Sequence, residues 1–403
     1  MKIVLITIGQ PSTNPRLVKE ASALANAGHE VIVLYCFWID WAFRSDKKLL
    51  ADVKWKFELV GGCPYANSSL FWYTKIKLKT FEFLNKWIGN KYGIAEIAQA
   101  KGYSQLLQRA KSIKADWYIG HILGSLPIAV NAALYNNAKA GFDFEDYHRA
   151  ENKPVSKVDV SRITYLENKY VPLLNYISTA SPLITDQVRL NFPIFINTVI
   201  TINNTFSKKD QLPFIKKNSN DNSLQLFWFS QTVGPDRGIE ILLDALAKLA
   251  DKEIFLTLIG KYTKDIEESF LRRAGEANAN IYFKGVVDPD NIAIIAATMD
   301  VGLALEQTIP YNRDICLTNK IFTYLQCGNA LILTNTKAQK QFQEQYNVGA
   351  ICNIGDVNGI CTILKEYKSN RNLLDQQKEK NWHLANELLN WENESKKLLA
   401  IIQ

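Results

Sequence analysis

The sequence predicts an α/β fold with two domains, each built on a parallel β-sheet. The chain has 403 residues, which is more than a single hydrophobic core usually spans. Short apolar runs typical of buried parallel strands alternate with helical patterns, and this alternation occurs in two successive series. A polar segment rich in Lys and Asn, residues 206–223, separates the series and has the composition of a linker. The expected domains are residues 1–205 and 224–383.

The first series opens with a strand–helix–strand unit. A strand is expected at residues 2–8, and Gly9 opens the loop that follows it. Thr13 or Asn14 can cap a helix that has Pro15 at its first position and Gly28 just past its end. The strands expected next along the chain lie at residues 29–36, 115–122, 140–146 and 176–181.

The second series repeats this order of elements without repeating the residues. A helix is expected at residues 238–250, and the stretch 317–333 is a helix and a buried strand separated by Gly328. The tail, residues 384–403, is predicted to be one helix that packs back on the first domain. The strands expected in this series lie at residues 224–230, 254–260, 281–287, 300–306 and 330–334.

Composition restricts the kind of ligand. The 47 basic and 40 acidic residues leave a net charge of +7, which suits an anionic ligand or an anionic membrane surface but is too small to indicate nucleic acid. The six cysteines show no C-x-x-C spacing and no histidine at metal-ligand spacing, so neither a disulfide framework nor a metal site is expected. Neither a signal peptide nor a transmembrane span is expected, and the predicted location is the cytoplasm.

Ligands of open parallel sheets bind at the carboxyl ends of the strands. That rule directs attention to the loop after Gly9, to residues 230–238, to the turn after Val287, to the loop after Glu306 and to the helix start at Lys320. The dinucleotide fingerprint G-x-G-x-x-G and the P-loop motif are both absent from the sequence, which argues against a dehydrogenase or a kinase.

Two cations are predicted at helix N-termini in the second domain. Arg237 and Lys320 would each cost up to about 1 kcal/mol there, because the helix dipole favours an anion. A diphosphate bound between them reverses that sign. The alternative is that each is an exposed cation without a partner. Thr323 shares a helical face with Lys320 and is either a ligand-facing hydroxyl or a solvent-exposed one.

The order of these parts resembles the GT-B-fold glycosyltransferases, most of all the family 4 retaining enzymes. The resemblance is carried by "GHEVIVL", "SQTVGPDRGIEILLDAL", "IYFKGVVDPDNIAIIAATMDVGLALE" and "TNKIFTYLQCGNALIL". It covers nearly the whole chain, strongly in the second domain and more generally in the first. It implies two Rossmann-like domains whose parallel sheets face a central cleft.

The resemblance also implies a set of donor-site residues. Arg237 and Lys320 would bind the diphosphate, the turn at Val286 and Val287 would meet the base, and Glu306 would approach the sugar. Gly9 would let the backbone approach the donor. The implied donor-binding positions are Gly9, Gln231, Arg237, Val287, Glu306, Asn319, Lys320 and Thr323.

Three positions depart from the family pattern. Gln231 stands where the family has a basic residue, and Thr323 stands where it has the second glutamate of a two-glutamate motif. In the segment 141–154, Glu145 replaces the expected site histidine, and His148, two residues beyond Asp146, can take its place. This acidic segment is either part of the catalytic site or a solvated charged turn.

The resemblance implies metal-independent transfer with retention, in which Arg237 and Lys320 stabilise the leaving diphosphate. The expected donor is a UDP- or GDP-linked sugar, and the expected acceptor is a saccharide or a lipid-linked glycan of cell-envelope polysaccharide synthesis. Two alternatives remain open: a GT-B epimerase or hydrolase using Glu145, Asp146 and His148 as acid and base, and a non-catalytic protein that binds nucleotide-sugars.

A basic, aromatic segment at residues 71–91 bears on the acceptor. At helical spacing, Trp72, Ile76, Phe83 and Trp87 share one face, and Lys75, Lys79 and Lys86 flank it. This pattern is typical of a helix lying on an anionic bilayer, although a helix packed in the core would look similar. A second aromatic cluster lies at residues 35–44. Exposure of both clusters would favour a lipid-linked acceptor and peripheral membrane contact.

Overall fold

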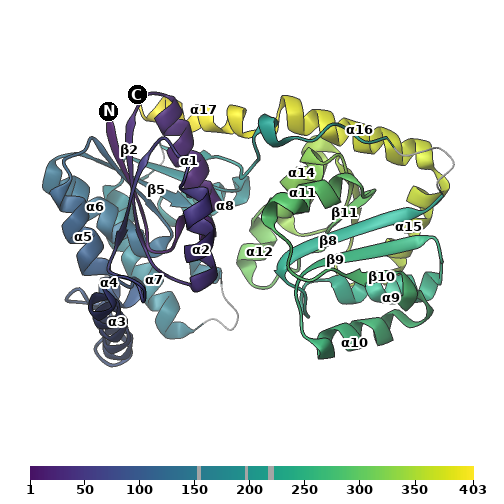
Figure 1. Cartoon of the computed structure of the whole chain (residues 1–403), viewed down its shortest axis with the longest axis horizontal. Helices are drawn as coiled ribbons and strands as arrows, with labels where there is room; N and C mark the ends of the chain where they lie inside the picture. The colour runs from purple at the N-terminus through teal and green to yellow at the C-terminus, as the bar shows by residue number, and fades with distance from the viewer. Residues whose placement is uncertain (152–155, 196–197, 217–221) are drawn as a thin grey trace. The chain divides into compact units, whose positions relative to one another are not determined.

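The structure is a computed structural model that describes residues 1–151, 156–195, 198–216 and 222–403. Parts of the expected linker (217–221) and of the acidic segment (152–154) lie outside the described residues. The chain divides into two compact units, one formed by Met1–Ile202 with Ser395–Gln403, the other by Asn203–Glu394. Figure 1 shows that each unit is a sheet flanked by helices.

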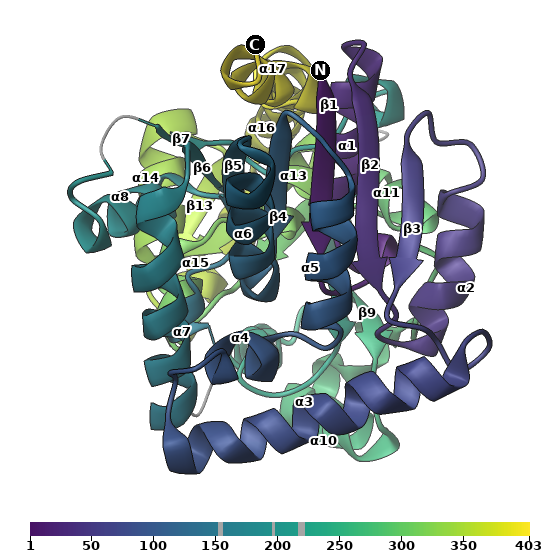
Figure 2. The ribbon, with the colours of Figure 1, turned by 90° about the vertical axis from the view of Figure 1, so that its left-hand side faces the viewer.

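Unit 1 is built on a seven-stranded, all-parallel sheet in the order β3-β2-β1-β4-β5-β6-β7. Its strands are β1 (Lys2–Thr7), β2 (Glu30–Cys36), β3 (Lys56–Val60), β4 (Trp117–His121), β5 (Lys139–Phe144), β6 (Tyr176–Thr179) and β7 (Val199–Thr201). Its helices are α1 (Pro15–Asn26), α2 (Asp40–Leu49), α3 (Ser68–Ile88), α4 (Ile94–Gln99), α5 (Tyr103–Ser112), α6 (Leu126–Asn136), α7 (Lys157–Tyr170) and α8 (Pro182–Asn191). Figure 2 shows them around this sheet.

Unit 2 has a six-stranded parallel sheet in the order β10-β9-β8-β11-β12-β13. Its strands are β8 (Leu224–Thr232), β9 (Ile254–Lys261), β10 (Ile281–Phe283), β11 (Val301–Ala304), β12 (Ala330–Thr334) and β13 (Gly349–Cys352). Its helices are α9 (Ile239–Leu249), α10 (Lys264–Ala274), α11 (Pro289–Ala297), α12 (Tyr311–Ile315), α13 (Asn319–Gln326), α14 (Lys337–Tyr346), α15 (Val357–Ser369) and α16 (Arg371–Glu387). The last helix, α17 (Trp391–Ile401), continues into unit 1.

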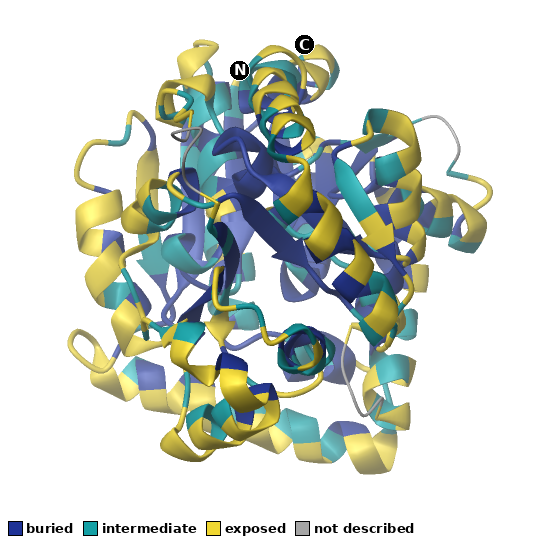
Figure 3. Cartoon of the chain, turned by 90° about the vertical axis from the view of Figure 1, so that its right-hand side faces the viewer, coloured by how far each residue is buried: buried dark blue, intermediate teal, exposed yellow. Residues whose placement is uncertain are grey.

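Local sequence explains the first helix of unit 1. The Asn14 side chain accepts a hydrogen bond from the Leu17 amide at 3.0 Å, and Pro15 begins the helix, as predicted. The face formed by Leu17, Ala21 and Leu24 is fully buried. In unit 2 the central strands β11 and β12 are likewise buried, while the outer faces of the helices are exposed (Figure 3).

Three strands were not predicted: β3, β7 and β13. Each has at most five residues, and each is the last or edge strand of its sheet, so a long apolar run is not required. The strand expected at 281–287 ends at Phe283, because Gly285 turns the chain with a φ of +69°.

The tail expected as one helix over 384–403 is two helices. Helix α16 ends at Glu387, and α17 starts at Trp391 after Asn390, whose side chain accepts a hydrogen bond from the Asn393 amide at 3.0 Å. The described part of the expected linker packs on unit 2, because the Gln211 side chain donates to the Gln326 and Trp382 carbonyls.

Candidate functional site

Both sheets have a switch point, where the strand order changes direction. In unit 2 the switch lies between β8 and β11, and in unit 1 it lies between β1 and β4. Open parallel sheets bind ligands at such points, beyond the carboxyl ends of the two strands. In unit 2 the loops after β8 and β11 contain Arg237 and Glu306, two of the predicted donor-site residues.

These two loops approach each other closely at Gly238. Its φ is +79°, and a Cβ atom built there would lie 2.2 Å from the Leu305 carbonyl oxygen. The adjacent Arg237 guanidinium donates to the Ser230 and Thr232 hydroxyls at 3.0 and 3.1 Å. Burial and the positive charge of Arg313 lower the pKa of Arg237, partly opposed by Glu306. A cation held by neutral hydroxyls beside another cation is suited to an anionic ligand.

Arg313 is a residue of this region that sequence reasoning did not identify. It lies on α12, in the long loop between β11 and α13, and it donates to the Asp236 carbonyl oxygen at 3.0 Å. This contact fixes Arg313 beside the residue that precedes Arg237. Its basic side chain was visible in the sequence, but the fold of an irregular loop determines where that side chain lies.

Lys320 lies in the first turn of α13, as predicted, but it already has a partner. Its ammonium group is 2.5 Å from a carboxylate oxygen of Glu306, so the alternative of an exposed cation without a partner is wrong for Lys320. Glu306 also accepts hydrogen bonds from Thr318 and Gln339. Burial alone would raise the pKa of Glu306, but Lys320 and the Gln339 hydrogen bond outweigh it and lower that pKa.

The other predicted residues of unit 2 differ in their surroundings. Thr323 is buried and its hydroxyl donates to the Asn319 carbonyl at 3.1 Å, so the solvent-exposed alternative is wrong. The Asn319 side chain accepts from Asn204 at 2.8 Å. Gln231 is exposed at the end of β8, and Val287 is half-buried in the loop after β10. The centre of the candidate site is Arg237, Glu306 and Lys320, because Lys320 pairs with Glu306 and the Glu306 charge acts on Arg237.

In unit 1 the loop after β1 contains Gly9 at the switch point. A Cβ atom there would lie 3.1 Å from the Thr13 hydroxyl, so the backbone is closely packed. Gln10 holds the loop through a hydrogen bond from its amide to Asp46 at 3.0 Å and one that it accepts from the Trp38 amide at 2.9 Å.

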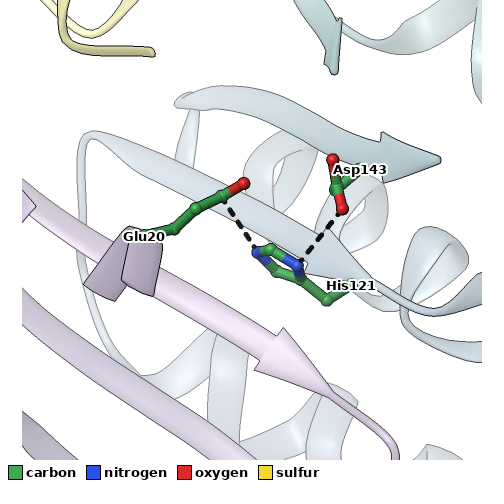
Figure 4. Close-up of side chains that lie close together, drawn as sticks. All are labelled: Glu20, His121 and Asp143. Carbon is green, nitrogen blue, oxygen red and sulfur yellow. Dashed lines mark ion pairs between the residues drawn. The ribbon is translucent and has the colours of Figure 1, made fainter. Parts of the chain in front are cut away.

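A fully buried charged cluster lies beside this loop (Figure 4). Arg16 makes a bidentate pair with Asp143, at 2.7 and 2.8 Å. His121, the last residue of β4, lies between two carboxylates: Nε2 is 3.2 Å from Glu20 and Nδ1 is 3.7 Å from Asp143. Burial lowers the pKa of His121, but Glu20 and Asp143 raise it overall.

Glu20, His121 and Asp143 are the kind of residues that bind a metal ion, and their side chains lie close together. However, the two carboxylates approach opposite nitrogens of the imidazole (Figure 4), and Arg16 engages both oxygens of Asp143. With His121 protonated, the four groups balance two positive and two negative charges. We therefore interpret the cluster as a buried ionic network. Of these four residues only Asp143 lies in a segment that the sequence singled out, residues 141–154. The spacing of Arg16 and Glu20 by four helical residues was an available signal.

The acidic segment after β5 divides into two environments. Burial, Asp146 and Asp143 raise the pKa of Glu145 to about 7. His148 is also buried, but its partners differ: Nδ1 lies 3.6 Å from Glu167 of α7, and the ring lies against Phe144. A solvated turn is therefore not the right interpretation for His148. Glu145 and Asp146 follow β5 directly, at the carboxyl edge of the sheet.

No protein-family model matches the chain, and no curated protein matches it by sequence. Solved structures match along the full length. The Anabaena protein HepE, in complex with UDP and glucose, has a TM-score of 0.69 at 14% identity, with 100% of this chain and 99% of that chain covered. The S. aureus protein TarM, a point mutant in complex with fondaparinux, alpha-GlcNAc-glycerol and UDP, has a TM-score of 0.68 at 12% identity, with 100% of both chains covered.

A further match is WaaG, a glycosyltransferase involved in lipopolysaccharide biosynthesis, with a TM-score of 0.62 at 11% identity and coverage of 99% and 98%. At identities this low, the full-length structural matches establish the fold alone. The two parallel sheets with helices on both faces agree with that fold. The narrower resemblance to family 4 stays a prediction. The chain has the GT-B fold of these glycosyltransferases, with two Rossmann-like units.

Proposed function

We propose that the protein is a retaining glycosyltransferase, independent of metal, that transfers a sugar from a UDP-linked donor to a saccharide or lipid-linked acceptor of cell-envelope polysaccharide synthesis. The observation that carries the proposal is the group of cations at the switch point of unit 2. Arg313 donates to the carbonyl of Asp236, which precedes Arg237, and Lys320 lies in the first turn of α13. The UDP complexes of HepE support UDP as the first nucleotide to test.

A diphosphate would compete with Glu306 for Lys320. The Glu306 carboxylate would not lose all of its partners, because Thr318 and Gln339 also donate to it. The buried acid therefore avoids the full cost of an unsatisfied charge when Lys320 turns to the ligand. The ion pair with Glu306 holds the lysine at the helix start.

The chemical role of these cations is to stabilise the leaving group. As the bond between the sugar and the diphosphate breaks, negative charge grows on the β-phosphate, and Arg237 and Lys320 interact with it more strongly than in the ground state. The acceptor hydroxyl attacks the same face of the sugar and passes its proton to the leaving diphosphate. This route requires neither a strong protein base nor a metal ion.

Glu145 supports a second candidate, a GT-B epimerase or hydrolase. A carboxyl group with a pKa of about 7 can both donate and accept a proton near neutral pH. Incubation of the protein with UDP-sugars in the absence of acceptor separates the two activities. Substantial epimerisation or hydrolysis would favour the second candidate, and turnover that needs an added acceptor would favour the transferase.

Nucleotide binding tests the donor site directly. UDP should raise the melting temperature of the protein, and Arg237→Ala, Arg313→Ala and Lys320→Ala should each weaken UDP binding by about tenfold or more, since each removes a charge-assisted hydrogen bond. Arg272→Ala, an exposed cation on α10, is the matched control and should leave affinity unchanged. If UDP, GDP and ADP all fail to stabilise the protein, or if Lys320→Ala binds UDP normally, the donor site is wrongly placed. Binding without transfer to any acceptor would indicate a non-catalytic protein.

A further inference from the structure

Helix α3 presents an apolar face to solvent. The side chains of Trp72, Ile76, Phe83 and Trp87 share that face, and they are 53%, 64%, 60% and 76% exposed. Monomeric soluble proteins rarely expose several large apolar residues contiguously without a binding partner. The alternative of a helix with this face in the core is wrong.

The opposite face of α3 anchors the helix to unit 1. Phe71, Thr74 and Asn85 are buried, and the Phe71 ring lies 5.5 Å from that of Phe37 in an edge-to-face arrangement. The Thr74 hydroxyl lies 3.4 Å from the Gly61 carbonyl oxygen. Helix α3 therefore packs on unit 1 through its inner face, and its aromatic face remains exposed for a binding partner.

These anchors place α3 at a defined edge of the sheet. Phe37 directly follows β2, and Gly61 directly follows β3, so α3 crosses the carboxyl ends of these strands (Figure 2). Gly9 and His121 lie at the carboxyl ends of β1 and β4, on the same edge. The exposed face thus belongs to the edge at which parallel sheets bind ligands.

The charge of α3 identifies the chemistry of its partner. The helix contains four lysines and one glutamate, Lys75, Lys77, Lys79, Lys86 and Glu82, a net charge of +3. Lys79 pairs with Glu82 at 2.7 Å, and the Lys75 ammonium lies 4.8 Å from the centre of the Trp72 ring. Aromatic rings flanked by lysines are typical of helices that lie in the interface of an anionic bilayer.

A second exposed aromatic group lies beside the start of α3. Trp38, which precedes α2, and Trp41, in the first turn of α2, are exposed, while their neighbour Phe37 is buried against Phe71. Of the expected cluster at residues 35–44, the tryptophans are therefore at the surface and Phe37 is in the core. In the sequence, each of the two contacting phenylalanines is followed by an exposed tryptophan: Trp38 after Phe37 and Trp72 after Phe71.

We propose that the exposed face of α3, with Trp38 and Trp41, docks on an anionic lipid bilayer. None of the helices in the described parts of the chain has the length and apolarity to cross a bilayer, and the proposal is of contact at the surface. A second copy of this chain is a poorer occupant, because two such faces would bring net charges of +3 together. The role that we assign to this docking rests on the proposed function: contact with the bilayer would bring a lipid-linked acceptor to the carboxyl edge of unit 1.

Vesicle binding by the full chain tests the proposal without any nucleotide. The protein should sediment with vesicles of phosphatidylcholine mixed with phosphatidylglycerol, less with phosphatidylcholine alone, and less at high salt. The double variants Phe83→Gln/Trp87→Gln and Lys75→Gln/Lys86→Gln should each weaken binding by about tenfold or more. The control Leu134→Gln/Leu190→Gln replaces two exposed apolar residues on α6 and α8 and should bind like the unmodified protein.

Three results would overturn the docking proposal: no binding of the unmodified protein to anionic vesicles, equal binding by the α3 variants, or loss in those variants of a dimer detected by sedimentation velocity without lipid. The UDP-induced shift in melting temperature is measured on the same samples. An intact shift with no vesicle binding rejects the membrane surface alone, whereas a missing shift with vesicle binding rejects the donor site alone.

Discussion

The side chain of Lys320 pairs with Glu306 in the structure, whereas the sequence led us to propose a diphosphate as its partner. A lysine in the first turn of a helix is unfavourable by itself, which suggested a diphosphate. The structure adds Glu306, from a loop fourteen positions upstream, at 2.5 Å from the lysine. This ion pair holds the cation in place, and the proposed diphosphate would have to compete with it. Thr323 is also engaged within the chain, because its hydroxyl group donates to the Asn319 carbonyl. The hydroxyl oxygen can still accept a hydrogen bond.

The buried histidine of unit 1 makes stability depend on pH. The pKa of His121 is raised overall by Glu20 and Asp143, so its ion pairs are fully formed below the ordinary histidine value of about 6.5 and are lost as the pH rises through the raised value. His121→Gln should therefore lower the free energy of unfolding by about 3 kcal/mol near pH 6 and by less near pH 9. Urea denaturation across this pH range measures the difference.

The exposed His383 supplies the control for that experiment. It lies on α16, beside Glu387 at 3.4 Å. His383→Gln should follow the unmodified protein at every pH. If the effect of His121→Gln is the same at pH 6 and pH 9, the imidazole is not charged in the folded state and the ionic network is misassigned.

At the scale of elements, the loops after β8 and β11 are packed together more tightly than their sequences suggest. The segment "GPDRG" indicated a turn, but not that Gly238 lies against Leu305. Helix α3 shows the same limit in another form. Its aromatic periodicity was visible, and the sequence left both core and surface open, because periodicity shows which residues share a face and not what that face meets.

Gly238→Ala should destabilise unit 2 strongly. The substitution places a Cβ atom 2.2 Å from the Leu305 carbonyl oxygen at a φ of +79°, so the loop must move. We expect a loss of about 3 kcal/mol, from the left-handed strain of about 1–2 kcal/mol together with the clash. Chemical denaturation followed by a probe in unit 2 gives the value.

Gly355→Ala separates strain from the clash. Gly355 also has a positive φ, +83°, but its added Cβ would meet open space. It should cost only about 1 kcal/mol. Equal losses in the two variants would mean that the close approach of the two loops contributes nothing to stability.

At the scale of the whole molecule, the chain repeats one architecture without repeating its sequence. Six strands of unit 1 and the six of unit 2 follow the same order, with two strands on one side of the first and the later strands on the other. Many different sequences have the same alternation of apolar strands and amphipathic helices, and this alternation favours such a sheet. The two halves therefore need not share residues. The end of the chain then returns to the unit that contains its beginning.

The last residues of the chain should stabilise unit 1. Leu398 is fully buried on α17, in the segment that belongs to this unit. Leu398→Ala should reduce the free energy of unfolding by about 3 kcal/mol, through lost burial and the cavity that remains. Differential scanning calorimetry, with unit 2 marked by its response to UDP, assigns the loss to a unit.

Leu388 is the matched control on the same tail, because it is 52% exposed between α16 and α17. Leu388→Ala should change stability by less than about 0.5 kcal/mol. A similarly small effect of Leu398→Ala would show that the tail does not contribute to the core of unit 1.

The sequence by itself determined the α/β fold class, most strands and the start of the first helix at Pro15, because each depends on local periodicity or end signals. It also predicted Arg237 and Lys320 as cations for a diphosphate, and it left the cap of that helix open between Thr13 and Asn14, which the structure resolved in favour of Asn14. Only the tertiary structure decided that Glu306 pairs with Lys320, that Arg313 reaches the loop before Arg237, and that Arg16, Glu20 and His121 gather around Asp143. It also decided that the aromatic face of α3 is at the surface. These features join residues distant in the chain, and such contacts are set by how the loops pack, which no local pattern encodes.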